Sequence, residues 1–134
     1  MSFEMPQKVL FRHCDPAGIV FFPRYFEMMN DCVEAFFDRI GHPFETLHKS
    51  GAVPTAEIET RFLRPSRHGD ALILSLRIAH LGRTSLRLSI DTACGPEARM
   101  TYRARLVHVG PAMTPAPWPA PLHAALSAHI EHED

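Results

Sequence analysis

The 134-residue sequence has no uninterrupted apolar stretch long enough to cross a bilayer, and its first residues lack the apolar segment of a secretory signal. Only three cysteines are present, at unrelated spacings, which argues against a disulfide framework and favours a reducing cytoplasm. The formal net charge of −1 gives no electrostatic reason to expect a nucleic-acid partner. We therefore expect a cytoplasmic protein whose partners include neither a membrane nor a nucleic acid.

Lysine is also scarce, with two lysines against twelve arginines. The forked guanidinium group of arginine suits phosphate binding. The abundance of Ala and Pro instead favours a bias in composition from a GC-rich genome, and both interpretations remain open. At 46% hydrophobic residues the chain has enough apolar content for one core, and it shows no internal repeat. We predict a single domain over residues 1–134.

The segment from Arg12 to Gly41, RHCDPAGIVFFPRYFEMMNDCVEAFFDRIG, contains the one long helical pattern of the sequence. Between Pro23 and Ile40 the apolar residues recur every three or four positions, which predicts an amphipathic helix. Pro23 suits a first helical position, where a missing N–H costs nothing, and Gly41 suits a left-handed cap. Both ends of the predicted helix are therefore defined.

Elsewhere the apolar residues alternate with polar ones, which is typical of strands. The predicted strands are Gln7–His13, Pro54–Arg64, Ala71–His80, Thr84–Cys94 and Glu97–Val109. Four of them are joined by short turns, so we predict an antiparallel sheet with the helix packed on one face, an α+β arrangement.

Two further segments complete the prediction. Residues Phe44–Ser50 form a polar, loosely helical connection after the long helix. The tail from Gly110 to Pro121 has five prolines and is predicted to be an extended connector. A short terminal helix is predicted over Leu122–Ile130, within a tail that runs from 110 to 134.

Asp15 is the leading candidate for chemistry, because it lies in a turn between a predicted strand and the start of the helix. The first N–H groups of a helix lack intrahelical partners and carry a partial positive charge, so they can hold a carbonyl oxygen while a carboxylate attacks or activates water. The alternative is that Asp15 only closes its own turn as an Asx residue. Both interpretations remain open.

The neighbours of Asp15 are weaker candidates. Adjacent residues of an extended chain point to opposite faces, so His13 and Cys14 do not form a catalytic pair. Cys14 is interpreted as a small apolar residue. No further ligands accompany His13 and Asp15, so no metal site is expected.

Two runs carry a family resemblance: HCDPAGIVFFPRYFEMMNDCVEAF at residues 13–36 and FLRPSRHGDALILSLRI at 62–78. The chain resembles the 4-hydroxybenzoyl-CoA thioesterase family of the hotdog fold over roughly residues 7–109. The resemblance implies a curved antiparallel sheet around one long helix. It also implies homodimers joined edge to edge, sometimes paired into homotetramers. The implied activity is hydrolysis of an aromatic or a short to medium acyl-CoA, with no cofactor because coenzyme A is part of the substrate.

The same resemblance implies roles for individual residues. Asp15 would be the nucleophile or the general base, the backbone N–H of Phe22 would hold the thioester oxygen, and Gly18 would let the turn approach the substrate. The implied substrate contacts are Phe21, Tyr25, Asn30 and Arg83, of which Arg83 is the candidate for the CoA phosphates. Arg64 and Arg67, in the preceding connector, are further candidates for the phosphates because of their charge alone. Asn30 stands where an acidic side chain facing a phenol hydroxyl would be expected, which bears on acyl specificity and not on hydrolysis.

Two alternatives to a thioesterase remain open. A hydratase or dehydratase on the same fold would use a His paired with an Asp or Glu, and the Asp-Pro-Ala-Gly turn matches hydrolysis better. A non-catalytic acyl-CoA or acyl-carrier binding dimer would need Asp15 only for structure.

Overall fold

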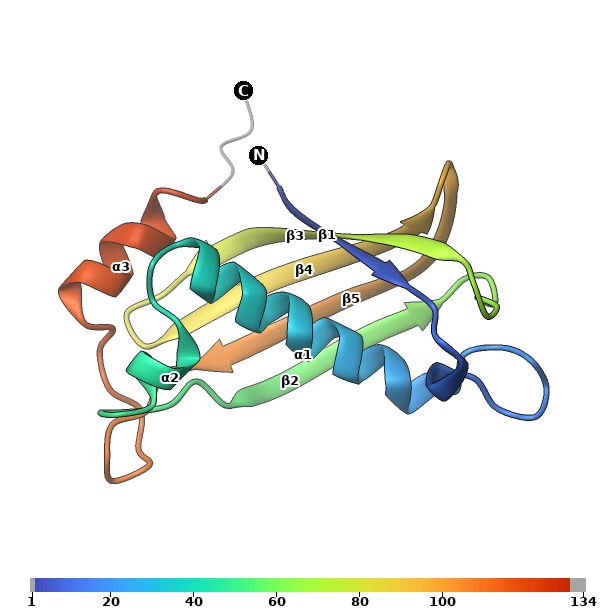
Figure 1. Cartoon of the computed structure of the whole chain (residues 1–134). Helices are drawn as coiled ribbons and strands as arrows, with labels where there is room; N and C mark the ends of the chain where they lie inside the picture. Colours follow the sequence, from blue (N-terminus) through green and yellow to red (C-terminus); the bar gives the residue numbers. More distant parts are fainter. Residues whose placement is uncertain (1, 131–134) are drawn as a thin grey trace.

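The computed structural model describes residues 2–130, which form a five-stranded antiparallel sheet in the order β1-β3-β4-β5-β2. The long helix α1 (Phe22–Arg39) lies diagonally across one face of this sheet (Figure 1). The other elements are β1 (Phe3–Lys8), the 3₁₀ turn η1 (Phe11–His13), α2 (Phe44–Leu47), β2 (Thr55–Phe62), β3 (Ala71–Leu81), β4 (Ser85–Cys94), β5 (Glu97–Val107) and α3 (Ala120–Ser127). The predicted α+β arrangement of a sheet wrapped around one helix is confirmed.

The predicted central helix is confirmed to within one residue at each end. Pro23 occupies its first turn, and Gly41, with φ of +88°, follows its last turn. The N–H groups of Gly41 and His42 donate to the carbonyls of Asp38 and Phe37, which is the Schellman arrangement expected of a glycine cap. The buried face of α1 consists of Tyr25, Met28, Met29, Cys32, Val33, Phe36 and Phe37.

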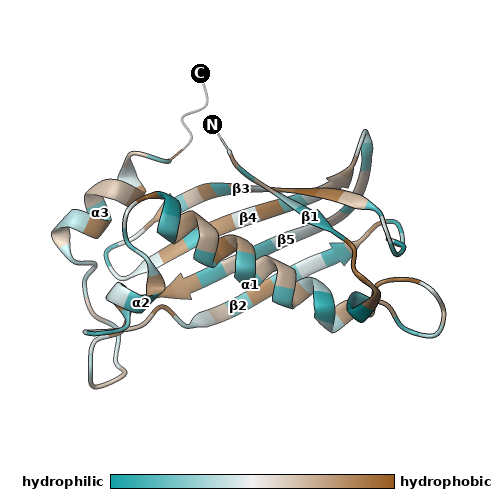
Figure 2. Ribbon diagram, in the orientation of Figure 1, coloured by the Kyte–Doolittle hydropathy of each residue, from teal (hydrophilic) through white to brown (hydrophobic). Residues whose placement is uncertain are grey.

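The face of the sheet toward α1 is apolar, and the opposite face is charged. Along each inner strand the apolar residues alternate with polar ones, a pattern visible along the ribbons in Figure 2. The buried residues of β3, β4 and β5 include Leu72, Leu74, Leu76, Ile78, Leu86, Leu88, Ile90, Met100 and Leu106. Each such side chain contributes roughly 1.5–3 kcal/mol on burial, so this layer fixes α1 and therefore the position of its first turn.

The prediction of a first strand over Gln7–His13 is wrong in its position. The strand begins at Phe3 and ends at Lys8, and a 3₁₀ turn follows at Phe11–His13. The N–H of Leu10 donates to the Nδ1 atom of His13 (2.9 Å) and not to a neighbouring strand. In a strand over these residues Val9 and Phe11 would share one face, but Val9 is fully buried and Phe11 is 81% exposed.

The remaining strands are confirmed to within a few residues at their ends, and β3 continues one residue beyond the predicted His80, to Leu81. Strand β2 lies within the predicted Pro54–Arg64, and β5 ends at Val107 instead of Val109. The loosely helical connection is the single turn α2, and the terminal helix α3 starts and ends earlier than predicted. Residues 131–134 of the predicted tail lie outside the described residues. No helix in the described part of the chain is both long and apolar enough to span a membrane.

Candidate active site

The Asp15 turn is a tight loop closed by its own backbone. The N–H of Asp15 donates to the carbonyl of Ile19 (3.0 Å), and the N–H of Gly18 donates to the carbonyl of Asp15 (2.9 Å). Gly18 has φ of +80°, a conformation that a side chain makes costly. The Asp15 Oδ1 atom accepts the N–H of Ala17 (2.9 Å), as in an Asx turn. The second carboxylate oxygen has no hydrogen bond or ion pair to any residue that the structure describes.

The turn leads directly into the start of α1. The N–H of Phe21 donates to the carbonyl of His13 (2.9 Å), and the helix begins at the next residue, Phe22. Within residues 2–130 no backbone carbonyl accepts the N–H of Phe22, and Pro23 has no N–H at all. A free N–H at the positive end of an 18-residue helix is a ready donor to a developing oxyanion.

His13 fixes the geometry of this turn from inside the fold. Its ring is 4% exposed, and Nδ1 accepts the N–H of Leu10, which assigns the proton of the neutral ring to Nε2. Burial lowers the pKa of His13 from 6.5, and the neighbouring Arg12 charge lowers the pKa further. A neutral His13 therefore holds Leu10 through its ring and Phe21 through its carbonyl.

The connector between β2 and β3, residues 63–70, lies against the second half of the turn. The N–H of Val20 donates to the carbonyl of Ser66 (2.9 Å), and Ile19 forms an antiparallel bridge with Arg67. Ser66 is fully buried. Burial raises the pKa of the Tyr25 phenol, and hydrogen bonding with Ser66 opposes part of that rise. Ser66 therefore connects the turn with the first turns of α1.

The predicted site residues line two open hollows on either side of the helix start. Asp15 and Phe21 line a hollow of about 520 Å³, while Phe22, Tyr25 and Arg64 line a second one of about 300 Å³. The Phe21 and Phe22 rings, 5.5 Å apart, belong to different hollows. The single chain thus brings Asp15 near the helix start without enclosing the carboxylate and the Phe22 N–H in one pocket.

Three predicted substrate contacts lie away from Asp15 or only at the border of the site. Asn30 is exposed on α1, about 12 Å beyond Phe22 at 1.5 Å per residue, and lines neither hollow. Arg67 contacts the turn through its backbone bridge with Ile19. Arg83 is in the β3–β4 hairpin, at the opposite end of the sheet from the Asp15 turn (Figure 1).

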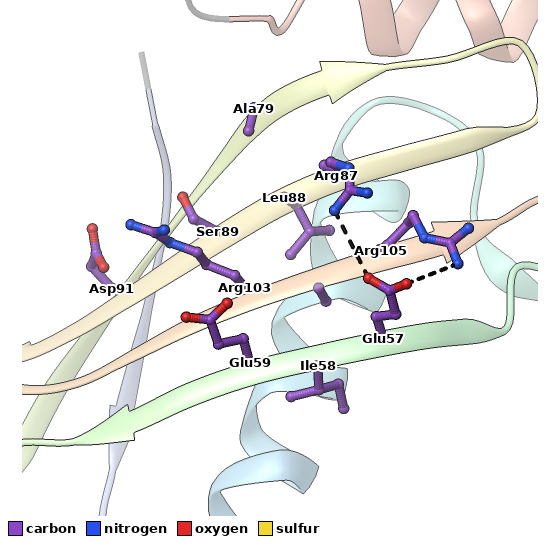
Figure 3. A pocket seen from close by; sticks show the side chains of 11 residues that line it. Glu57, Ile58, Glu59, Ala79, Arg87, Leu88, Ser89, Asp91, Arg103 and Arg105 are labelled. Atoms are coloured by element: carbon purple, nitrogen blue, oxygen red, sulfur yellow. Dashed lines mark hydrogen bonds and ion pairs between the residues drawn. The ribbon is translucent and has the colours of Figure 1, made fainter.

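A hollow of about 660 Å³ on the outer face of the sheet is the alternative candidate for the active site (Figure 3). Its charges neutralise one another: the Glu57 carboxylate lies 4.0 Å from Arg87 and 3.3 Å from Arg105. It contains no helix end to hold an oxyanion. Among residues 2–130 there is also no group of three or more His, Cys, Asp or Glu placed to hold a metal. The Asp15 turn is therefore the candidate active site.

The sequence prediction did not identify the polar group that holds the connector. The Arg99 Nη1 atom donates to the Ser66 Oγ (3.1 Å), to the Pro65 carbonyl (3.2 Å) and to the Asp70 carboxylate (2.7 Å). These positions are about thirty residues apart in the chain. The pairing of β2 with β5 alone brings them together, since it places Phe62 opposite Met100.

Comparisons with known proteins agree with this fold. Residues 9–126 match the model of the thioesterase-like superfamily. The chain is 30% identical over 115 residues to a 4-hydroxybenzoyl-CoA thioesterase of a Pseudomonas species, covering 81% of this chain and 82% of that protein. It is 23% identical over 130 residues to a 1,4-dihydroxy-2-naphthoyl-CoA hydrolase of a Synechocystis species, covering 93% and 94%.

The crystal structure of a 1,4-dihydroxy-2-naphthoyl-CoA thioesterase from Synechocystis superposes with a TM-score of 0.88 at 19% identity, over 95% of this chain and 96% of that one. That likeness confirms the hotdog fold. The match of the superfamily model to most of the chain, with the Pseudomonas relative, confirms the predicted thioester hydrolase at the level of the family. The chain belongs to the thioesterase-like superfamily.

Proposed function

We propose that the protein hydrolyses an aromatic acyl-CoA thioester, with Asp15 as the reacting carboxylate and the Phe22 N–H as the oxyanion donor. The observation that carries this proposal is the free N–H of Phe22 at the start of α1, directly after a turn that leaves one Asp15 oxygen without a partner. The two relatives are both named for aryl-CoA substrates, which supports an aromatic acyl group.

The reaction follows one of two courses from this arrangement. As a nucleophile, the Asp15 carboxylate attacks the thioester carbon, the carbon–sulfur bond breaks, and CoA leaves as a thiolate that takes a proton from water. Water then hydrolyses the mixed anhydride to the free acid and restores Asp15. As a general base, Asp15 takes a proton from the attacking water instead. In both courses the Phe22 N–H stabilises the negative oxygen, and no cofactor takes part.

The aromatic side chains beside the helix start suit a planar acyl group. The Tyr25 and Phe62 rings lie 5.7 Å apart, and the Phe22 and Phe62 rings lie 6.4 Å apart at a steep angle. Offset and edge-on aromatic contacts of this kind stabilise an inserted ring beyond its area of burial. Arg64, which lines the same hollow, is an exposed cation at its rim.

The active form in this proposal is a homo-oligomer built on the edge of β2. Seven of the eight residues of β2 are exposed, and Ile58 and Phe62 are 48% and 49% exposed. A long edge strand with apolar side chains is a surface that proteins normally cover. The other edge, β1, contains Pro6, which has no N–H to pair with a further strand. A second copy therefore pairs through β2.

A reducing cytoplasm is the proposed compartment. All three cysteines lie in the described part of the chain and are free thiols. Cys32 is fully buried, and burial raises its pKa to about 12. Three free cysteines, one of them buried and unreactive, fit an intracellular protein.

Asp15→Asn tests the proposal. The amide can still accept the Ala17 N–H, so the variant should fold and bind acyl-CoA, whereas kcat should fall by about 10²–10⁴, the range for loss of a positioned base. The matched control is Asp38→Asn, which changes an exposed aspartate of the same segment and should leave kcat unchanged. The measurements are thiol release from a panel of aryl-CoA and alkyl-CoA thioesters, a thermal melt and an acyl-CoA binding isotherm.

The same panel, extended by one unsaturated acyl-CoA, separates the alternatives. A wild-type protein that binds acyl-CoA without releasing thiol would be the non-catalytic binding dimer. An enzyme that adds water to an unsaturated acyl chain without releasing thiol would be the hydratase. A folded, binding-competent Asp15→Asn variant that keeps more than about a tenth of wild-type turnover would contradict the role of Asp15.

A further inference from the structure

Arg99, at the start of β5, is the centre of a polar cluster next to the candidate active site. Its side chain is only 11% exposed, although it carries a full charge. One nitrogen, Nη1, donates to three acceptors of the connector, those of Pro65, Ser66 and Asp70. The Nε atom lies 2.7 Å from a Glu97 carboxylate oxygen, as a charge contact without the alignment of a hydrogen bond.

The backbone of Arg99 holds the same connector. Its carbonyl accepts the N–H of Leu63 (2.8 Å) and the N–H of Arg64 (3.2 Å), where β2 ends. Asp70 holds the other end of the connector. Its Oδ2 atom accepts hydrogen bonds from the Arg67 N–H (2.9 Å) and from the Arg99 guanidinium. These two donors, the Arg67 N–H first, lower the pKa of the Asp70 carboxyl. The connector is therefore fastened at several points to one residue of β5.

The second half of the Asp15 turn packs against this connector. Ser66 accepts the N–H of Val20, and Arg67 bridges to Ile19. Residues 19 and 20 immediately precede Phe21, whose N–H is also bonded, and then the free N–H of Phe22. A shift of Ser66 would shift Val20, and the direction of the Phe22 N–H would change with it.

We propose that Arg99 is a positioning residue for the thioesterase reaction. It holds the 63–70 connector so that Ser66 and Arg67 fix residues 19–20 and, through them, the oxyanion donor at the start of α1. Arg99 touches neither hollow and so contacts no reacting atom in the proposed chemistry. This inference rests on the proposed function for its effect on turnover, while its effect on the turn is independent of any activity.

Arg99→Met tests the inference, because methionine keeps much of the length of the side chain and removes all of its donors. The matched control is Arg103→Met, which removes an exposed arginine of the same strand that lines the outer hollow of Figure 3. Amide hydrogen exchange of residues 15–22 should become roughly 10- to 100-fold faster in Arg99→Met, while β3 and β4 keep their protection. Arg103→Met should exchange as the wild type does.

Turnover supplies the second readout. A misplacement of about 1 Å at a reacting group costs up to about 10²-fold, so kcat of Arg99→Met should fall roughly 10- to 100-fold. KM should stay within about threefold, because the lost interaction is made mainly in the transition state. A purely structural role would instead lower the fraction of folded enzyme, leaving KM and the kcat of the folded fraction intact.

Asp70→Asn keeps the inference testable if Arg99→Met does not fold. The amide oxygen can still accept both N–H donors of Oδ2, but it lacks the negative charge that strengthens the bond to the Arg99 guanidinium, so the same changes should appear in milder form. Unchanged exchange of residues 15–22 in a folded Arg99→Met or Asp70→Asn protein would overturn the proposal. An inactive wild type would overturn the proposed function alone, since the exchange experiment would still report whether Arg99 holds the turn.

Discussion

His13 holds both ends of the Asp15 turn, although it is not one of the reacting groups. The ring accepts the Leu10 N–H before the turn, and the His13 carbonyl accepts the Phe21 N–H after it. A protonated ring would carry a proton on Nδ1, where the Leu10 N–H now donates. The bond that shapes the turn therefore requires the neutral form of His13.

The stability of the protein should consequently depend on His13 at mildly acid pH. The folded pKa lies below the unfolded value of 6.5, so the unfolded chain binds a proton that the folded chain does not. Stability should be complete above pH 6.5 and should fall as the pH drops below 6.5, by at most about 1.4 kcal/mol per pH unit. Urea unfolding between pH 7.5 and 5.5 measures this slope.

His13→Asn is the matching variant, because its amide oxygen can accept the Leu10 N–H and does not titrate. It should flatten the dependence of unfolding free energy on pH over the same interval. A slope equal to that of the wild type would show that other groups cause the acid sensitivity.

The Asp15 turn depends on the backbone conformation of one glycine. No atom lies within 4 Å of the position that a Cβ of Gly18 would take, so space is not the restriction there. The positive φ is the restriction, and it costs an alanine roughly 1–2 kcal/mol. Asparagine adopts this conformation more readily than alanine.

Gly18→Ala should therefore destabilise the fold by about 1 kcal/mol and lower kcat, while Gly18→Asn should be milder in both respects. Thermal melts and thiol-release kinetics on the two variants give the comparison. If asparagine is as harmful to kcat as alanine while the melts differ, the glycine is needed for a close approach of the substrate to the backbone instead.

Much of the fold could be predicted from the sequence because its elements are locally encoded. The apolar spacing of α1, its Pro23 and its Gly41 lie within one segment, and the predicted helix agrees with the structure. The first strand could not be placed correctly. The alternating pattern of apolar residues continues through Phe11. The sequence does not show that the Leu10 N–H donates to the His13 ring instead of to a neighbouring strand.

The candidate site was less predictable, because it is assembled from distant segments. Asp15 and Phe22 are close in sequence and were identified with the help of the family resemblance. Ser66 and Arg99 join the site only through the pairing of β2 with β5, so no local pattern marks them. Arg83, predicted through the family resemblance, lies at the far end of the sheet from Asp15.

The separation of Arg83 from Asp15 within one chain would be bridged if two copies paired through β2. Strand β2 runs from Thr55, beside the end of β5, to Phe62, beside the start of α1. In a two-fold dimer that pairs β2 with β2 antiparallel, the Thr55 end of one copy lies alongside the Phe62 end of the other. The hairpin with Arg83 is at the Thr55 end, since Ser85 pairs with Val107. In such a dimer, Arg83 of the partner subunit would lie at the same end of the joined sheet as the Asp15 turn.

Arg83→Ala should then raise KM by roughly 10- to 100-fold, the equivalent of a charge-assisted hydrogen bond of about 1.5–3 kcal/mol to a CoA phosphate. The value of kcat should be almost unchanged, because a remote phosphate contact is similar in the ground and transition states. A pantetheine thioester without the nucleotide should show no difference between variant and wild type. An equal rise of KM on both substrates would indicate an effect through packing.

Mixed dimers test which subunit supplies the arginine. Asp15→Asn and Arg83→Ala subunits, co-expressed with different affinity tags, form a dimer in which one site combines Asp15 of the Arg83→Ala copy with Arg83 of the Asp15→Asn copy. If the arginine acts across the interface, that site is intact, and the mixed dimer should turn over with wild-type KM and about half the wild-type kcat per dimer. If Arg83 serves its own copy, the active site of the mixed dimer lacks it and KM should remain raised. A mixed dimer with only the raised KM would contradict the action of Arg83 across the interface, and an active monomer in sedimentation would contradict the interface through β2.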